Sequence, residues 1–191
     1  MARWRMTGRV AVVLLALLLL SFAPRTEHAV LAQDGQTMVT IKPVSGTYAV
    51  GDTIAVEVWI EDVEDLYGAD VRLRFNPSRF TVQDADLTQP GVQITPRADL
   101  LSPDIVVKKE ADNAAGTVWY AVSQLNPRPP ASGSGAICSF TLQVLSGWNG
   151  DLTIHYHKLS DKNAEEIESA AQDASYTLEG TGYLFLPLIY R

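Results

Sequence analysis

The sequence predicts an all-β fold in which two sheets pack face to face as a β-sandwich. From residue 38 onward, most segments alternate apolar and polar residues with the period of two that half-buried strands show. Gly, Pro, Asn and Asp separate these segments, and helical periodicity is confined to a turn near residues 164–171. About nine such strands, each with one apolar face, are best buried as two packed layers.

The first three strands show the alternation most clearly. Residues 38–44 form the first strand, and the Gly51-Asp52 turn leads into the second, residues 53–60. In the second strand, alternate residues from Ile54 to Ile60 face inward. The third strand lies within DLYGADVRLRFNP, residues 65–77. Its inward residues are Ala69, Val71, Leu73 and Phe75, and its outward residues are Asp70, Arg72 and Arg74.

Six further strands complete the sandwich. They are predicted at residues 80–82, 104–109, 117–123, 136–144, 152–157 and 175–180. In the strand at 152–157, we expect Leu152, Ile154 and Tyr156 to face inward. Residues 84–103 and 126–135 are predicted loops, and the second of these contains Pro129 and Pro130, which lack the N–H that a strand ladder needs.

The N-terminal segment, residues 1–32, has the pattern of a signal peptide. Arg3, Arg5 and Arg9 precede an apolar run at residues 10–20, and small residues stand before a cleavage site at Gln33. The apolar run is shorter than the roughly 18–20 residues that span a bilayer, although a retained anchor is the alternative. We therefore expect a secreted chain, associated with the cell surface if the anchor is kept.

Charge and cysteine content narrow the function classes. The chain carries a net charge of −7, and without residues 1–32 it has 11 basic and 21 acidic side chains, a balance of −10. An acidic surface argues against nucleic acid and anionic membranes as partners. Cys138 is the only cysteine, and it shares a face with Phe140 and Leu142, so we expect a buried, inert thiol and no disulfide framework.

Four blocks of the sequence, taken together, carry a family resemblance. They are residues 44–77, GTVWYAVS at 116–123, SGSGAICSFTLQV at 132–144 and LSDKNAEEI at 159–167. In this order they resemble a cohesin domain, the secreted β-sandwich module that receives dockerin modules in cellulosomes and related assemblies. The wider superfamily includes carbohydrate-binding modules with the same topology. The cohesin-like domain is expected to cover residues 33–180.

The resemblance implies a nine-stranded jelly roll that binds a dockerin on the sheet made by strands eight, three, six and five. Asp70 stands where cohesins commonly carry an Asp that accepts hydrogen bonds from the partner, but Gly68 replaces the family's Asn. The usual Asn-Gly turn is Asn163-Ala164 here, which suggests a different turn type. The outward residues predicted on this sheet are Asp70, Arg72, Arg74, Trp119, Ala121, Ser123, Thr153, His155 and His157.

A docking face is the first hypothesis for these residues, because Trp and Arg often carry interface energy. The candidate partner-binding residues are Asp70, Arg72, Arg74, Trp119, Ala121, Ser123, His155 and His157. Direct polysaccharide binding is the alternative, and it requires a row of aromatic rings. The aromatic candidates are Trp59, Tyr67, Trp119 and Trp148, which the predicted strands do not place in a single row.

Metal binding and catalysis find little support in the sequence. The acidic run from Glu61 to Asp65 has ligands that suit Ca²⁺, but the resemblance assigns calcium to the loops of the dockerin partner. No nucleophile elbow or Ser-His-Asp pattern is present. We therefore expect no cofactor and a non-catalytic binding module for polysaccharide degradation or surface assembly.

The last segment, residues 181–191, is an apolar tail containing Pro187. It either docks on the domain's own surface or serves recognition by an envelope system, since it resembles the short LPL-containing ends of some exported bacterial proteins. A cell-envelope spacer anchored by this tail is accordingly a third hypothesis.

Overall fold

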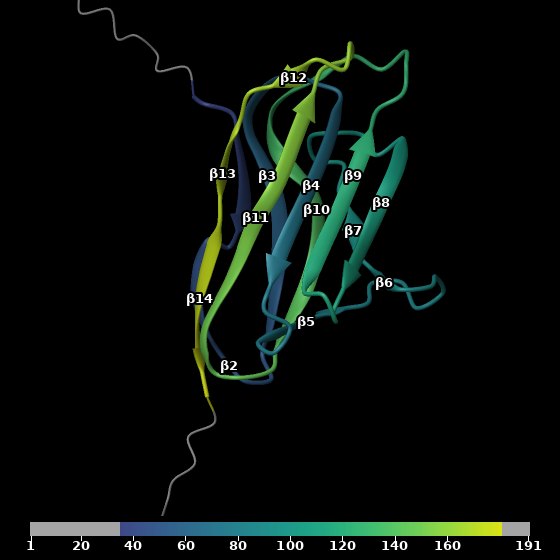
Figure 1. Ribbon diagram of the computed structural model, residues 1–191. Helices are drawn as coiled ribbons and strands as arrows, with labels where there is room; N and C mark the ends of the chain where they lie inside the picture. Colours follow the sequence, from purple (N-terminus) through teal and green to yellow (C-terminus); the bar gives the residue numbers. More distant parts are fainter. Residues whose placement is uncertain (1–34, 181–191) are drawn as a thin grey trace, which may run out of the picture. The chain divides into compact units, whose positions relative to one another are not determined.

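The protein is described by a computed structural model covering residues 35–180 (Figure 1). The predicted signal segment, residues 1–32, and the predicted tail, residues 181–191, lie outside this described part. The described residues form fourteen strands in two sheets, rather than the nine expected. No membrane-spanning helix occurs within this range. The apolar faces of the two sheets meet in one core, so the prediction of an all-β sandwich is confirmed.

The first layer, called the β3 sheet, has six strands in the order β13-β1-β3-β10-β5, with β7 also paired to β10. Its strands are β1 (Met38–Lys42), β3 (Thr53–Leu66), β5 (Phe80–Gln83), β7 (Thr95–Pro96), β10 (Ala131–Val144) and β13 (Ala170–Gln172). The β1–β13 pair is parallel, and the other pairs are antiparallel.

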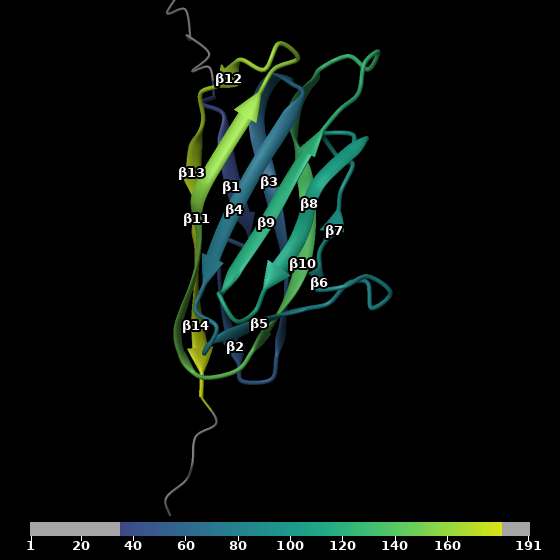
Figure 2. The same ribbon diagram turned by 45° about the vertical axis from the view of Figure 1, so that its right-hand side comes forward.

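The second layer, called the β4 sheet, has eight strands in the order β2-β14-β11-β4-β9-β8-β6, with β12 also paired to β11. Its strands are β2 (Ser45–Ala49), β4 (Gly68–Phe75), β6 (Val92–Gln93), β8 (Ile105–Asp112), β9 (Thr117–Ser123), β11 (Trp148–Ser160), β12 (Glu166–Ile167) and β14 (Ala174–Glu179). Figure 2 shows β4, β9 and β11 of this sheet in front of β1, β3 and β10.

The alternation within strands decides which side chains enter the core. The inward residues of β3, from Ile54 to Ile60, are each at most 1% exposed, as the alternation predicts. Burying one such side chain fully contributes about 1.5–3 kcal/mol. Cys138 of β10 has an exposure of 0%, and burial raises the pKa of its thiol, so the predicted buried cysteine is confirmed.

The first predicted strand is shorter than expected because the chain changes sheets at Pro43. Strand β1 ends at Lys42, whereas the prediction extended it to residue 44. Proline has no N–H to continue the ladder with β3. After it, β2 joins the β4 sheet instead and pairs in parallel with β14.

The predicted loop at residues 126–135 was wrong in its second half. Strand β10 begins at Ala131 and pairs with the far end of β3 through several register shifts. The hydroxyls of Ser132 and Ser134 accept hydrogen bonds from the backbone N–H groups of Asp65 and Asp62, at 3.1 and 2.9 Å. Side-chain oxygens thus replace carbonyls where the ladder is irregular. The other predicted loop, residues 84–103, contains only the two-residue strands β6 and β7.

Strands also replace the helical turn expected near residues 164–171, where β12 and β13 lie. The preceding turn is held by Asp161, whose Oδ1 accepts the N–H groups of Asn163 and Glu165, both at 2.8 Å. Ala164 has a positive φ of 65°, while Asn163 does not have a positive φ. A type I′ turn needs positive φ at both central residues, so the expected change of turn type is confirmed.

Candidate functional site

Four adjacent strands of the β4 sheet, β11, β4, β9 and β8, present one outer face (Figure 1). Their register places the outward residues in four rows across the strands. In the order β11, β4, β9, β8, the rows are Ser160-Gly68-Ser123-Ile105, Lys158-Asp70-Ala121-Lys108, Tyr156-Arg72-Trp119-Glu110 and Thr153-Arg74-Thr117-Asp112. We call this set the outer face.

A cluster around Arg72 occupies the centre of the outer face. The Arg72 guanidinium lies 4.2 Å from the ring centroid of Trp119 and 4.5 Å from that of Tyr156. Its Nε and Nη2 donate to the two oxygens of Asp70, at 3.2 and 2.8 Å. Trp119 Nε1 donates to Asp70 Oδ1 at 2.8 Å. The hydrogen bond to Asp70 raises the pKa of Arg72.

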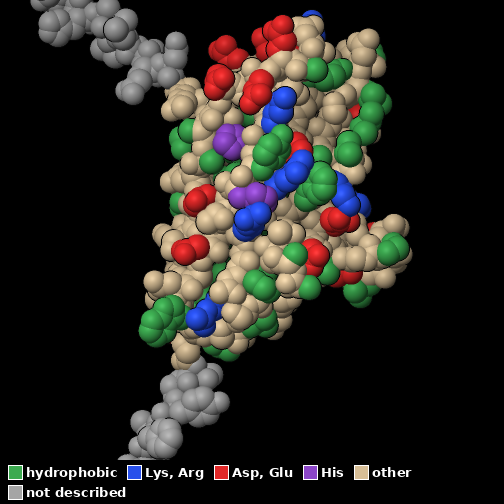
Figure 3. Space-filling view, in the orientation of Figure 1, with side chains coloured by type: hydrophobic (Ala, Val, Ile, Leu, Met, Phe, Trp, Pro, Cys, Tyr) green, Lys and Arg blue, Asp and Glu red, His purple; other side chains and the backbone are tan. Residues whose placement is uncertain are grey.

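These contacts join four side chains from three strands into one unit. Guanidinium stacking on aromatic faces and a bidentate carboxylate pair both restrict the side-chain rotamers. The indole and the phenol ring therefore stand in defined positions before any partner arrives. Figure 3 shows Lys and Arg side chains together with hydrophobic side chains in the middle of this face, and acidic side chains toward its upper end.

The prediction that Tyr156 faces inward was wrong. A β-bulge between Ile154 and Tyr156 inserts His155 as an extra residue, and Tyr156 then lies across from Arg72. Its side chain is 39% exposed. One extra residue inverts the alternation for the rest of the strand, and a period-two pattern does not reveal it.

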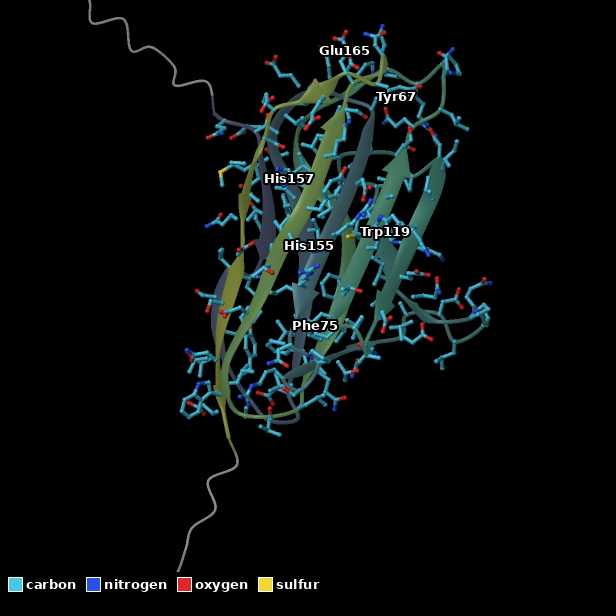
Figure 4. All side chains as sticks on the ribbon, in the orientation of Figure 1. Tyr67, Phe75, Trp119, His155, His157 and Glu165 are labelled. Atoms are coloured by element: carbon cyan, nitrogen blue, oxygen red, sulfur yellow. The ribbon has the colours of Figure 1, made fainter. Side chains whose placement is uncertain are left out.

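The same bulge separates the two histidines that were expected side by side on the outer face (Figure 4). His155 is exposed at the bulge, and its pKa is lowered by burial and by the positive charges of Arg74 and Arg72. His157 is partly exposed and lies across from Val71 rather than in one of the four rows, and its Nε2 donates to the carbonyl of Ser169 at 3.2 Å. His157 therefore links β11 to the segment before β13 and is not part of the outer face.

The remaining candidate partner-binding residues lie on the outer face, in different settings. Arg74 is exposed, and Ala121 is 8% exposed between Asp70 and Lys108. Ser123 Oγ donates to the carbonyl of Gln124 at 3.0 Å. At Gly68, an added Cβ would lie 2.9 Å from Ser160 Oγ, so an Asn side chain at this position would have to displace that hydroxyl.

Sequence reasoning missed several members of this face, among them Tyr156, Lys158 and Lys108. Tyr156 and Lys158 were hidden by the bulge, because their alternation changes there. Lys108 follows a second register shift, between Val106 and Lys108 of β8. Its Nζ forms an ion pair with Glu110 and lies 5.5 Å from the Trp119 ring. A run of two lysines after three apolar residues was the only available signal.

The four aromatic residues considered for sugar binding do not form a row. Trp59 lies on β3 and Trp119 on β9, so these two indoles belong to different sheets. Trp59 Nε1 donates to Glu57 at 2.8 Å, and Lys42 Nζ lies 3.9 Å from its ring centroid. Trp148, at the start of β11, is 76% exposed, and Tyr67 lies between β3 and β4.

The acidic segments contain no cluster of metal ligands. Within residues 35–180, no three His, Cys, Asp or Glu side chains are grouped so as to hold a metal ion. Glu61 is instead paired with Lys42 at 2.7 Å, and the hydrogen bond from this Lys lowers the pKa of Glu61.

A comparison of the sequence with models of protein families identifies the family of this β-sandwich domain. The model of the cohesin domain matches residues 37–175. The chain belongs to the cohesin family. Cohesin domains are non-catalytic binding modules, so this chain is not an enzyme. No curated protein sequence gave a significant match.

Solved structures share the fold of this cohesin domain at low sequence identity. A non-cellulosomal cohesin from the archaeon Archaeoglobus fulgidus has a TM-score of 0.59 and 14% identity, covering 76% of this chain and 93% of its own. A chain of a type I cohesin–dockerin complex from Clostridium thermocellum has a TM-score of 0.61 and 12% identity, covering 76% and 95%. A type II cohesin from Acetivibrio cellulolyticus has a TM-score of 0.59 and 14% identity, covering 74% and 95%.

Proposed function

We propose that this cohesin domain binds a dockerin-type module on the outer face of the β4 sheet. Family membership supports a binding function, and cohesin–dockerin complexes occur among the structural neighbours. The observation that carries the proposal is the outward-facing cluster of Trp119, Arg72 and Tyr156 on the β4 sheet, in which Tyr156 is exposed and the other two side chains are partly exposed. Aromatic and Arg side chains held in place in this way lose little conformational entropy when a partner covers them.

The residues proposed to touch the partner are those on the exposed side of β11, β4, β9 and β8. From the sequence they are Asp70, Arg72, Arg74, Trp119, Ala121, Ser123 and His155, to which the register adds Tyr156, Lys108 and Lys158. The outward position of Trp119 between Asp70 and Arg72 supports a central role for its indole.

The proposed setting is extracellular polysaccharide degradation or cell-surface assembly. The basic and apolar pattern of residues 1–32 supports export, and residues 33–180 then form the binding domain with an apolar tail at 181–191. The acidic balance of the chain is compatible with a protein that stays soluble outside the cell.

The test compares Trp119→Ala with Trp59→Ala in pull-downs against dockerin modules encoded in the same genome. The two indoles are well matched, since each donates to a carboxylate and each has a cation over its ring, but on different sheets. We expect Trp119→Ala to weaken binding by about 2 kcal/mol or more, roughly 30-fold, and Trp59→Ala to leave it unchanged.

Insoluble polysaccharides on the same array separate the alternatives. Retention by polysaccharide alone would support a carbohydrate-binding module, and retention by neither class would favour the envelope spacer. Dockerin binding that survives both Trp119→Ala and Asp70→Ala would exclude this face as the site.

A further inference from the structure

The carboxylates on the outer face are already engaged within the chain. Asp70 accepts three hydrogen bonds, two from Arg72 and one from Trp119, which leaves about one of the roughly four acceptor positions of a carboxylate. Glu110 is paired with Lys108. Asp112 Oδ1 accepts the N–H groups of Ala114 and Ala115, at 2.8 and 2.9 Å. The face therefore offers few free acceptors to a partner.

Its cations also form ion pairs at Arg72, Lys108 and Lys158, but they keep N–H donors that these pairs do not use. Arg72 donates hydrogen bonds to Asp70 from Nε and Nη2, which leaves Nη1 free to donate to another group. Arg74 is exposed and forms no ion pair within residues 35–180. Lys158 Nζ lies 3.6 Å from Glu166, too far for a hydrogen bond of normal length. The unused groups at the centre of the face are donors.

The region around Arg74 brings Arg72, Arg74 and His155 together, with the Asp151 carboxylate beside Arg74. His155 lies close enough to Arg74 and Arg72 that their charges help to lower its pKa. Arg74 also lines a hollow of about 320 Å³, and Asp151 in the same hollow is engaged by the Ser175 hydroxyl at 2.7 Å. Although the chain has a net charge of −7, Lys and Arg side chains gather in the middle of this face (Figure 3).

We propose that the partner presents carboxylate side chains to Arg72 and Arg74, rather than donors to Asp70. This inference rests on the proposed function and specifies the chemistry of the bound dockerin. Residues two apart on a strand lie about 7 Å apart. Two Asp or Glu side chains one turn apart on a helix, about 5–6 Å between Cβ atoms, match that spacing. The face then selects an acidic contacting segment by charge and by donor–acceptor complementarity.

The experiment measures binding of the purified chain to dockerins from the same genome by biolayer interferometry. Arg74→Gln removes one exposed charge from the outer face, and Arg97→Gln removes the same charge near Glu57 of the β3 sheet, where it serves as the control. We expect Arg74→Gln to weaken binding at least about tenfold, because hydrogen bonds between charged groups are strong, and Arg97→Gln to change it less than about twofold.

Two further arms identify the partner group. Arg74→Glu is expected to regain affinity when an Asp or Glu in the contacting segment of the bound dockerin is replaced by Lys. Association of the unmodified pair should slow as salt is raised, because screening weakens attraction between opposite charges.

The outcomes separate this inference from the proposed function. If Trp119→Ala abolishes dockerin binding while Arg74→Gln binds like the unmodified chain, the acidic partner is refuted and the docking face stands. Binding only to dockerins that lack Asp and Glu in the contacting segment would likewise refute the acidic partner and leave the docking face standing. If no dockerin binds the unmodified chain, both proposals fail.

Discussion

Replacing Tyr156 by Ala tests the placement of β11 most directly. If the alternation held to the end of the strand, Tyr156 would fill the core, and its loss would cost about 3–5 kcal/mol, as large-to-small core changes do. In the structure the ring is 39% exposed and stacks on Arg72, 4.5 Å from its guanidinium. A cation–π contact at such a site contributes about 0.5–1 kcal/mol. We therefore expect a loss of only about 1 kcal/mol.

Urea unfolding followed by tryptophan fluorescence measures this difference, and Tyr176→Ala supplies the comparison. Tyr176 of β14 is 1% exposed, and its hydroxyl donates to the carbonyl of Pro43 at 2.9 Å, so this variant should lose at least 3 kcal/mol. For a domain of about 150 residues, 1 kcal/mol corresponds to roughly 2–4 °C in Tm. Equal losses for Tyr156→Ala and Tyr176→Ala would refute the bulge at His155.

Two further predictions concern titratable groups. Cys138 should resist thiol reagents in the native protein at pH 8 and react on unfolding, because burial both shields the thiol and raises its pKa; rapid native labelling would contradict this. Arg74→Gln should raise the pKa of His155 in an NMR titration, since it removes one of the charges that lower it. An unchanged pKa of His155 in this variant would show that Arg74 is not its neighbour. The folded-state pKa of His155 lies below its ordinary value of 6.5, so its contribution to stability is complete above pH 6.5 and is lost as the pH falls through the folded-state pKa.

Much of the sandwich was predictable from the sequence because strand alternation is a local property. The inward residues of β3 from Ile54 to Ile60, and the inward and outward faces of β4, follow from the alternation of apolar and polar residues alone. The four blocks that resemble a cohesin domain also indicated which strands share the candidate face. Even the changed turn at Asn163-Ala164 was readable, because φ preferences act within two residues.

The contacts that define the candidate site required the tertiary structure. The bulge at His155 depends on how β11 pairs with β4, and it moved Tyr156 to the outer face and His157 away from it. Likewise, the sequence placed Asp70 and Trp119 on one face, but only the sheet register showed that Arg72 and Trp119 already engage the Asp70 carboxylate. Pairing register arises between segments far apart in the chain, so a pattern within one segment cannot specify it.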